Sequence, residues 1–364
     1  MSLRNYLDKI RPNFDEGGKL HAFKSVFDGF DSFLYVSSET SRSGVSIHDA
    51  IDSKRIMSLV VLALVPAMLF GMYNIGYQNA AAAGKLAEAS CWGMFLYGLL
   101  ALLPNILVSY IVGLGIEFAW AQWKGEEIQE GYLVSGILIP LIIPVTTPLW
   151  ILVLAVAFAV IFTKEIFGGT GMNIFNVALA ARAFLFFSYP AAMSGDNVWV
   201  RLSSTFGLGG EGKVVDGFTG ATPLGQIAGG NVADIHNTLG NPLTDWDAFL
   251  GFLPGSVGEV STLAILIGAC ILIFTGIASY KIMVSGVVGV IAMASLFNAI
   301  GTTPAMQVTA LQHLLYGGFA FGIVFMATDP VTAARTETGK WIYGFLIGVM
   351  VVFIRVLNAG YAEG

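Results

Sequence analysis

Ser135-Gly136-Ile137-Leu138-Ile139-Pro140 is followed closely by Pro144-Val145-Thr146, and a long apolar segment comes next. The same order recurs near the C-terminus, where Gly317-Gly318-Phe319-Ala320-Phe321-Gly322 leads to Asp329-Pro330-Val331-Thr332 and another apolar segment. A unit that occurs twice in this order predicts an internal repeat. Repeats of this kind build transport proteins whose binding sites lie between two halves.

The composition around these units is that of a membrane protein. Of 364 residues, 55% are hydrophobic and only 12% are charged, whereas soluble domains carry about 25% charged residues. We therefore expect an all-α polytopic membrane protein. The net charge of −6 argues against nucleic acid as a partner. Cys91 and Cys270 are too few for an iron–sulfur cluster, and the four histidines lack metal-ligand spacing, so we expect no metal.

Nine apolar segments have about the length that crosses a bilayer. They lie at residues 56–76, 93–121, 131–147, 149–165, 174–192, 259–278, 281–300, 308–328 and 341–360. These segments predict four regions along the chain. The regions are an N-terminal segment (1–55), a first transmembrane half (56–192), a long polar loop (193–258) and a second transmembrane half (259–364).

Lysine and arginine set the orientation, because they accumulate on the cytoplasmic side of a membrane protein. With the N-terminus in the cytoplasm, thirteen basic residues lie on the cytoplasmic side. Only Lys85, Arg201 and Lys213 lie on the other side. The long loop is then periplasmic. The first Pro-Val-Thr turn is outside and the second inside, so the two units are predicted to form an inverted repeat.

Two inverted halves of five helices require ten helices, one more than the nine that are visible. Nine spans also leave Gly364 outside, directly after a helix. We therefore expect a truncated copy of a longer protein, with an unpaired helical face beside the eighth and ninth spans.

The long loop contains Asp216-Gly217-Phe218-Thr219-Gly220-Ala221-Thr222. This run is similar to the acceptor site for covalent flavinylation, in which a transferase moves FMN from FAD onto the last threonine as a phosphoester. The small residues Gly220 and Ala221 are expected to keep the acceptor loop flexible and the threonine hydroxyl exposed. A Gly/Thr-rich turn without a cofactor is the alternative interpretation.

Two glycine-rich segments precede predicted spans. Phe167-Gly168-Gly169-Thr170-Gly171-Met172-Asn173 comes before the fifth span, and Pro254-Gly255-Ser256-Val257-Gly258-Glu259 before the sixth. Free N–H groups at helix starts bind anions, so the segment with Ser256 is a candidate for the phosphate of a flavin on Thr222. The alternative is that these glycines only permit close helix crossing. Glu259 opposes an anion site and fits a helix N-terminal charge.

Ionisable residues inside predicted spans are costly, so they usually pair or line a polar path. Asp329, at the end of the eighth span, is the candidate for an ion path. Arg182 either holds a bound aromatic ring or satisfies the carbonyls of a broken helix. Lys164 and Glu165 are expected to form an interfacial pair whose lysine reaches toward water. None of these residues is predicted to be catalytic.

Taken together, these segments resemble the B subunits of the sodium-translocating NADH:quinone reductase family over essentially the whole chain. The matching segments, in chain order, are Phe14 to Lys19, Asp52 to Met57, Lys164 to Gly171, Arg182 to Phe187, Asp216 to Thr222, Pro254 to Thr262 and Phe325 to Pro330. Two departures are a valine at 177, where the family commonly has proline, and a stretch at 201–213 that looks inserted.

The resemblance implies a redox subunit of a six-subunit sodium pump in the bacterial inner membrane. Its partners would be the other five subunits of the complex (A, C, D, E and F), a quinone, sodium ions and, during maturation, an FMN transferase. It implies covalent FMN on Thr222 and a non-covalent riboflavin associated with Asn173 and Asn176. It also implies that Gly113 and Glu117 lie on a helix associated with quinone-site and ion function. Together with Asp329 and Asp28, they make up the predicted quinone or ion path.

Because Asn173 and Asn176 are three residues apart, we expect them on one helix face, where their amides would donate to and accept from the flavin ring.

Two alternatives are open. One is the RnfD subunit of the related Rnf ferredoxin:NAD oxidoreductase, which carries the same flavin motif but usually begins almost at its first span. The other is a non-redox channel similar to urea transporters, which would bind no flavin.

Overall fold

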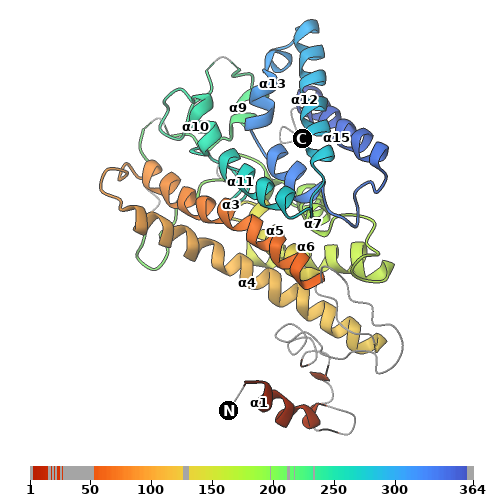
Figure 1. Cartoon of the computed structure of the whole chain (residues 1–364). Coiled ribbons are helices and arrows are strands. Elements are labelled where there is room, and N and C mark those ends of the chain that lie inside the picture. Colours follow the sequence, from red (N-terminus) through yellow and green to blue (C-terminus); the bar gives the residue numbers. More distant parts are fainter. Residues whose placement is uncertain are drawn as a thin grey trace.

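The computed structural model is built from helices and loops (Figure 1). It describes residues 3–14, 18, 20, 23–24, 27, 53–125, 131–196, 198–210, 214–216, 218–232 and 234–358. Across these ranges the β-pairing consists of two isolated bridges, Thr205 with Leu208 and His236 with Pro242. The predicted all-α class is therefore confirmed for the described residues.

Five helical stretches are long and apolar enough to cross a membrane. They are α3 (Ser53–Ala82), α4 (Cys91–Lys124), α6 (Leu149–Ala159) with its continuation η3 (Val160–Lys164) and η4 (Glu165–Phe167), α12 (Tyr280–Ile300) and α15 (Glu337–Leu357). The shorter apolar helices are α5 (Tyr132–Ile142), α7 (Val177–Ser188) and α11 (Thr262–Phe274). These helices indicate a multi-pass membrane protein, whereas the count of nine spans and the inverted repeat stay predictions.

The remaining elements are short. They are α1 (Leu3–Ile10), η1 (Arg11–Asn13), α8 (Pro190–Met193), α9 (Pro223–Ala228), α10 (Asp245–Leu250), η5 (Pro304–Gln307), α13 (Ala310–Leu315), α14 (Phe319–Phe321) and η6 (Gly322–Met326). Three of these, α13, α14 and η6, lie within the eighth predicted span, 308–328. That span is broken at Gly317. Its φ is +72°, a conformation that residues with a side chain rarely adopt.

Two other predicted spans are shorter than expected, each for a local reason. The third, 131–147, stops at Ile142 because Ile143 is extended (φ −105°, ψ 157°) ahead of Pro144. The fifth, 174–192, starts only at Val177 because the Asn176 side chain caps α7. Local proline and cap chemistry therefore overrides the apolar pattern at these helix ends.

Helix α3 lies between α4 and α11, and α4 in turn packs on α5 and α6 (Figure 1). The helices α12 and α15 form an extensive pair. Small residues allow these close crossings. A Cβ on Gly98 of α4 would lie 1.7 Å from the Met72 carbonyl oxygen of α3, and one on Gly348 of α15 would lie 2.1 Å from the Gly286 oxygen of α12.

The long loop is fastened to the end of α3 by buried amides. Asn74 Nδ2 donates to the Leu253 carbonyl over 2.9 Å, and Asn79 Nδ2 donates to the Arg201 carbonyl over 2.8 Å. The Gly210 N–H donates to Asn79 Oδ1 over 2.6 Å. These bonds satisfy polar groups that would otherwise be buried without partners, and they fix the loop that carries the flavin motif.

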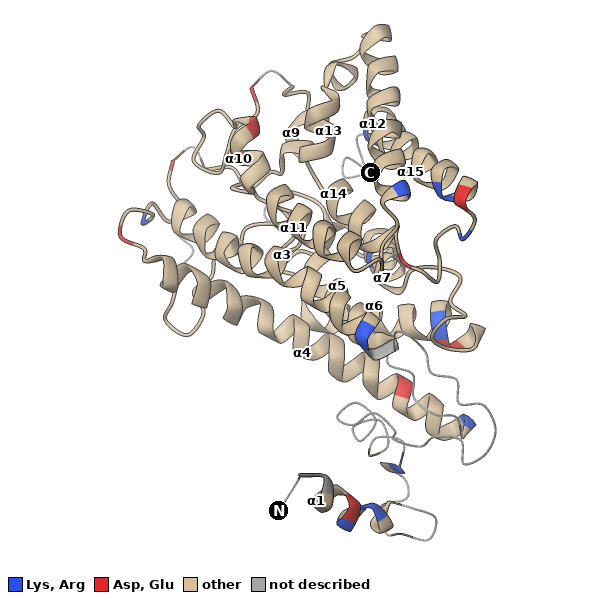
Figure 2. Cartoon of the chain, viewed as in Figure 1, with Lys and Arg blue, Asp and Glu red and all other residues tan. Residues whose placement is uncertain are grey.

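Charged residues are sparse along the helices and lie mostly at helix ends and in loops (Figure 2). Two charged residues are buried on facing elements: Glu117 inside α4 and Lys164 at the end of η3.

Candidate functional site

Thr222 is the N-cap residue of the short helix α9. Its hydroxyl oxygen accepts a hydrogen bond from the Gly225 N–H over 3.0 Å, and Pro223 follows as the first helical residue. The residue is only 9% exposed. The expectation of an exposed hydroxyl is therefore wrong, because the same hydroxyl that would carry a flavin caps the helix.

The segment around Thr222 is clamped by the side chain of Gln226. Its Nε2 donates to the carbonyls of Ala221 (3.2 Å) and His236 (2.8 Å), and its Oε1 accepts from the His236 N–H (2.9 Å). Gly220 is buried, and a Cβ there would lie 2.0 Å from the Asp196 carbonyl oxygen. Glycine at 220 thus permits close backbone approach rather than flexibility. Asp216, earlier in the motif, is exposed.

The segment that leads into α11 is held by an ion pair. Arg182 Nη1 on α7 donates to Glu259 Oε1 over 2.5 Å and to the Ile142 carbonyl over 2.8 Å. Of the two interpretations of Arg182, the structure shows the one in which it satisfies a carbonyl at the end of the broken helix α5. The hydroxyl of Ser256, only 2% exposed, donates to the other oxygen of Glu259. A phosphate role for Ser256 stays a prediction.

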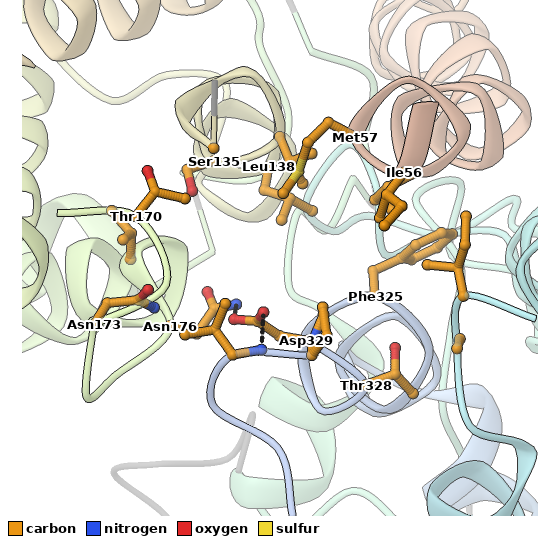
Figure 3. A pocket seen from close by; sticks show the side chains of 18 of the residues that line it. Ile56, Met57, Ser135, Leu138, Thr170, Asn173, Asn176, Phe325, Thr328 and Asp329 are labelled. Atoms are coloured by element: carbon orange, nitrogen blue, oxygen red, sulfur yellow. Dashed lines mark hydrogen bonds between the residues drawn. The ribbon is translucent and has the colours of Figure 1, made fainter. Parts of the chain in front are cut away.

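Asn173, Asn176 and Asp329 line one pocket (Figure 3). Asn176 Nδ2 donates to Asp329 Oδ2 over 3.3 Å. Thr170 adds a buried hydroxyl oxygen that has no hydrogen-bond partner among the described residues. Helix α5 supplies Ser135 and Leu138 on the opposite side, and the first turns of α3 supply Ile56 and Met57 (Figure 3). The structure therefore brings the predicted riboflavin residues and the predicted ion-path residue together.

The two asparagines do not share a helix face. Both precede α7, and the Asn176 Oδ1 accepts from the N–H groups of Ala178 (3.0 Å) and Leu179 (3.2 Å). Asn173 Nδ2 donates to the Phe175 carbonyl over 3.1 Å in the turn before the helix. The expectation of a shared helix face is therefore wrong, but the turn still places both amides on the pocket.

Gly113 and Glu117 lie on one side of α4 and face α5 and η3. A Cβ on Gly113 would lie 1.9 Å from Tyr132 Cζ, so only glycine leaves room for that ring. Glu117 forms an ion pair with Lys164, and both side chains are only 5% exposed. The expectation that Lys164 reaches toward water is therefore wrong. The π-helical turn Val160–Lys164 ends in a lysine that is directed to α4 instead.

Sequence reasoning missed Lys164 as a pocket residue. It lines the same pocket as Asn173 and Asp329 while it pairs with Glu117. An apolar segment that ends in a lysine predicts an interfacial charge, and nothing in the pattern signals the π-helical turn. Asp28 lies outside the described residues.

The chain is similar to known proteins along its whole length. The model of the NQR2, RnfD, RnfE family matches residues 40–364. The B subunit of the Na(+)-translocating NADH-quinone reductase from Chromohalobacter salexigens is 44% identical, over 100% of this chain and 90% of the relative. The B subunits of the same name from Pseudomonas aeruginosa and Neisseria meningitidis are also 44% identical, each over 100% of this chain and 92% of the relative.

Proposed function

The chain belongs to the NQR2, RnfD, RnfE family, and we propose that it is the B subunit of a sodium-translocating NADH:quinone reductase. The observation that carries the proposal is the 44% identity, along the full chain, to proteins of that name. In this role the chain passes electrons that originate in NADH toward quinone, while the complex exports sodium. Its partners are the other five subunits (A, C, D, E and F), and it lies in the inner membrane with the N-terminus in the cytoplasm.

Covalent FMN on Thr222 is part of this proposal. A flavin attached through its phosphate keeps an unmodified ring that carries one or two electrons. The Thr222 hydroxyl would form the ester after an FMN transferase delivers the flavin. Because Thr222 is only 9% exposed and its hydroxyl caps α9, the segment would have to open before a transferase could reach the hydroxyl. Gln226 and Gly220 would hold the modified segment in place.

The second flavin, riboflavin, is proposed for the pocket of Asn173 and Asn176. The donor set fits an uncharged flavin ring, because two amides and the Thr170 hydroxyl, which is unpartnered within the described chain, supply donors and acceptors for its N–H and C=O edges. The volume of this partly open pocket is about 90 Å³, below the roughly 300 Å³ of typical small-molecule sites. The ring would therefore be only partly enclosed, or the turn at 168–176 would move outward.

Quinone and sodium complete the proposal. Gly113 and Glu117 would lie at the quinone or ion path on α4, where Gly113 leaves room for the Tyr132 ring. Asp329 would bind sodium, because carboxylate oxygens are ligands for hard cations. Its Oδ2 already accepts from the Thr332 hydroxyl over 3.1 Å and from Asn176, so the carboxylate is held in one orientation.

The experiment compares electron donors. Inverted membrane vesicles that contain the complex with this chain, and so expose its cytoplasmic face, should take up sodium when NADH is oxidised with quinone as acceptor. The same vesicles with the Thr222→Asn variant should not. Sodium uptake that depends on reduced ferredoxin and NAD, rather than on NADH and quinone, would instead identify an RnfD-type subunit. A protein that never carries flavin would support the non-redox channel.

A further inference from the structure

Lys164 lies between α4 and the pocket that precedes α7. Its ammonium pairs with Glu117 on α4, and Lys164 is one of the residues that line the pocket of Asn173, Asn176 and Asp329. The second carboxylate oxygen of Glu117 is buried and has no hydrogen-bond partner in the part of the chain that the structure describes. The pair is therefore a buried charge pair that borders the pocket, and its acidic member is incompletely satisfied.

Two residues of opposite charge line the pocket. They are Lys164 and Asp329, and the Asp329 carboxylate accepts a hydrogen bond from Asn176. Lys164 is 4% exposed, so bulk water screens its charge poorly.

We propose that Lys164 raises the reduction potential of the ring bound in this pocket, and that Glu117 limits this effect by neutralising the ammonium from the opposite side. This proposal rests on the proposed function, in which the pocket takes an uncharged flavin. Lys164 then acts through the charge that it places near the ring, and its ion pair with Glu117 couples the pocket to α4.

The physical reason is the charge that reduction adds. Each electron that reaches the ring from the NADH-fed chain adds a negative charge, unless a proton from water follows it. A nearby ammonium stabilises that added charge, whereas a nearby carboxylate opposes it. In a poorly screened site, changes to Lys164 and to Glu117 must therefore shift the potential in opposite directions.

The test uses the full chain with Thr222→Asn, which removes the proposed covalent flavin, loaded with riboflavin and titrated with dithionite. Lys164→Met should lower the midpoint potential of the bound riboflavin. The double variant K164R/E117Q should raise it, because arginine stays protonated when its carboxylate partner is removed. Lys281→Met is the matched control, since Lys281 also pairs with a glutamate at a span end, Glu337. It should leave the midpoint unchanged.

The proposal would be overturned if the midpoint potentials of Lys164→Met and K164R/E117Q shifted in the same direction. It would also be overturned if both equalled the midpoint potential of the Lys281→Met control. If Lys164→Met fails to fold or to retain riboflavin, the charge swap K164E/E117K keeps a buried pair with reversed polarity. That variant should lower the midpoint, and an unchanged value would overturn the proposal. A parent chain that binds no riboflavin contradicts the pocket itself, and a riboflavin-loaded chain with insensitive midpoints contradicts only the role of Lys164.

Discussion

The side chain of Asn176 joins two segments that are 153 residues apart, because its Oδ1 caps α7 while its Nδ2 donates to Asp329 Oδ2 over 3.3 Å. The start of α7 and the turn that follows η6 therefore share one amide. A ligand that forms a hydrogen bond with this amide or this carboxylate would therefore compete with the bond between the two segments. This contact connects the residues proposed for flavin with the residue proposed for sodium.

Asn176→Ser separates the cap from the bond to Asp329. Serine is as good an N-cap as asparagine, so the stability of the protein should change little. Serine cannot supply the amide, however, so riboflavin should bind about fivefold more weakly, as for the loss of one hydrogen bond worth about 1 kcal/mol. Asn173→Leu should have a similar effect. The measurement is the amount of acid-extractable riboflavin per chain. An unchanged amount in N173L/N176S would show that these amides do not bind riboflavin.

Gly113→Ala should destabilise the packing of α4 on α5. The new Cβ would lie 1.9 Å from Tyr132 Cζ, so the ring must move, at a cost of about 1–3 kcal/mol. Gly115→Ala on the same helix is the control, because a Cβ there meets no described atom within 4 Å. Thermal unfolding in detergent should show a lower midpoint for Gly113→Ala alone. Equal midpoints for the two variants would mean that Tyr132 is not confined by Gly113.

Arg182→Met should be among the most damaging single changes in the helical region. It leaves Glu259, 7% exposed, without its cation and removes a donor from the Ile142 carbonyl. Breaking a buried pair costs about 3–5 kcal/mol, and the 18% exposure of Arg182 places this pair at the lower end. The double variant R182M/E259Q removes both charges and should recover part of the loss in the unfolding midpoint. A double variant no more stable than Arg182→Met would show that the charge pair is not the cause.

The sequence predicted the helical class, but not the local causes of the contacts at the candidate sites. The alternative in which Arg182 serves a broken helix was correct, because Pro144 forces the end of α5. The shared helix face of Asn173 and Asn176 was wrong, since the cap chemistry of Asn176 starts α7 later than the apolar pattern does. The burial of Lys164 follows from a π-helical turn, which a hydropathy pattern does not encode.

The role of Thr222 as a helix cap predicts different stabilities for two substitutions. Thr222→Val removes the oxygen that accepts from the Gly225 N–H, and the loss of such a cap costs about 0.5–2 kcal/mol. Thr222→Asn keeps an oxygen that can accept, so it should be close to the parent. Native-state hydrogen exchange at Gly225 and Gln226 would compare the two, and equal protection in both variants would argue that the cap does not hold α9.

The central claim is that Thr222 carries FMN, and the mass of the intact chain tests it most directly. The chain purified from the complex should be heavier than its sequence by one FMN less one water, and the extra mass should lie on the peptide that contains Thr222. Thr222→Asn keeps the cap but has no hydroxyl to esterify, so its chain should have the unmodified mass. An unmodified parent chain, or a Thr222→Asn chain that still carries the flavin mass, would contradict the claim.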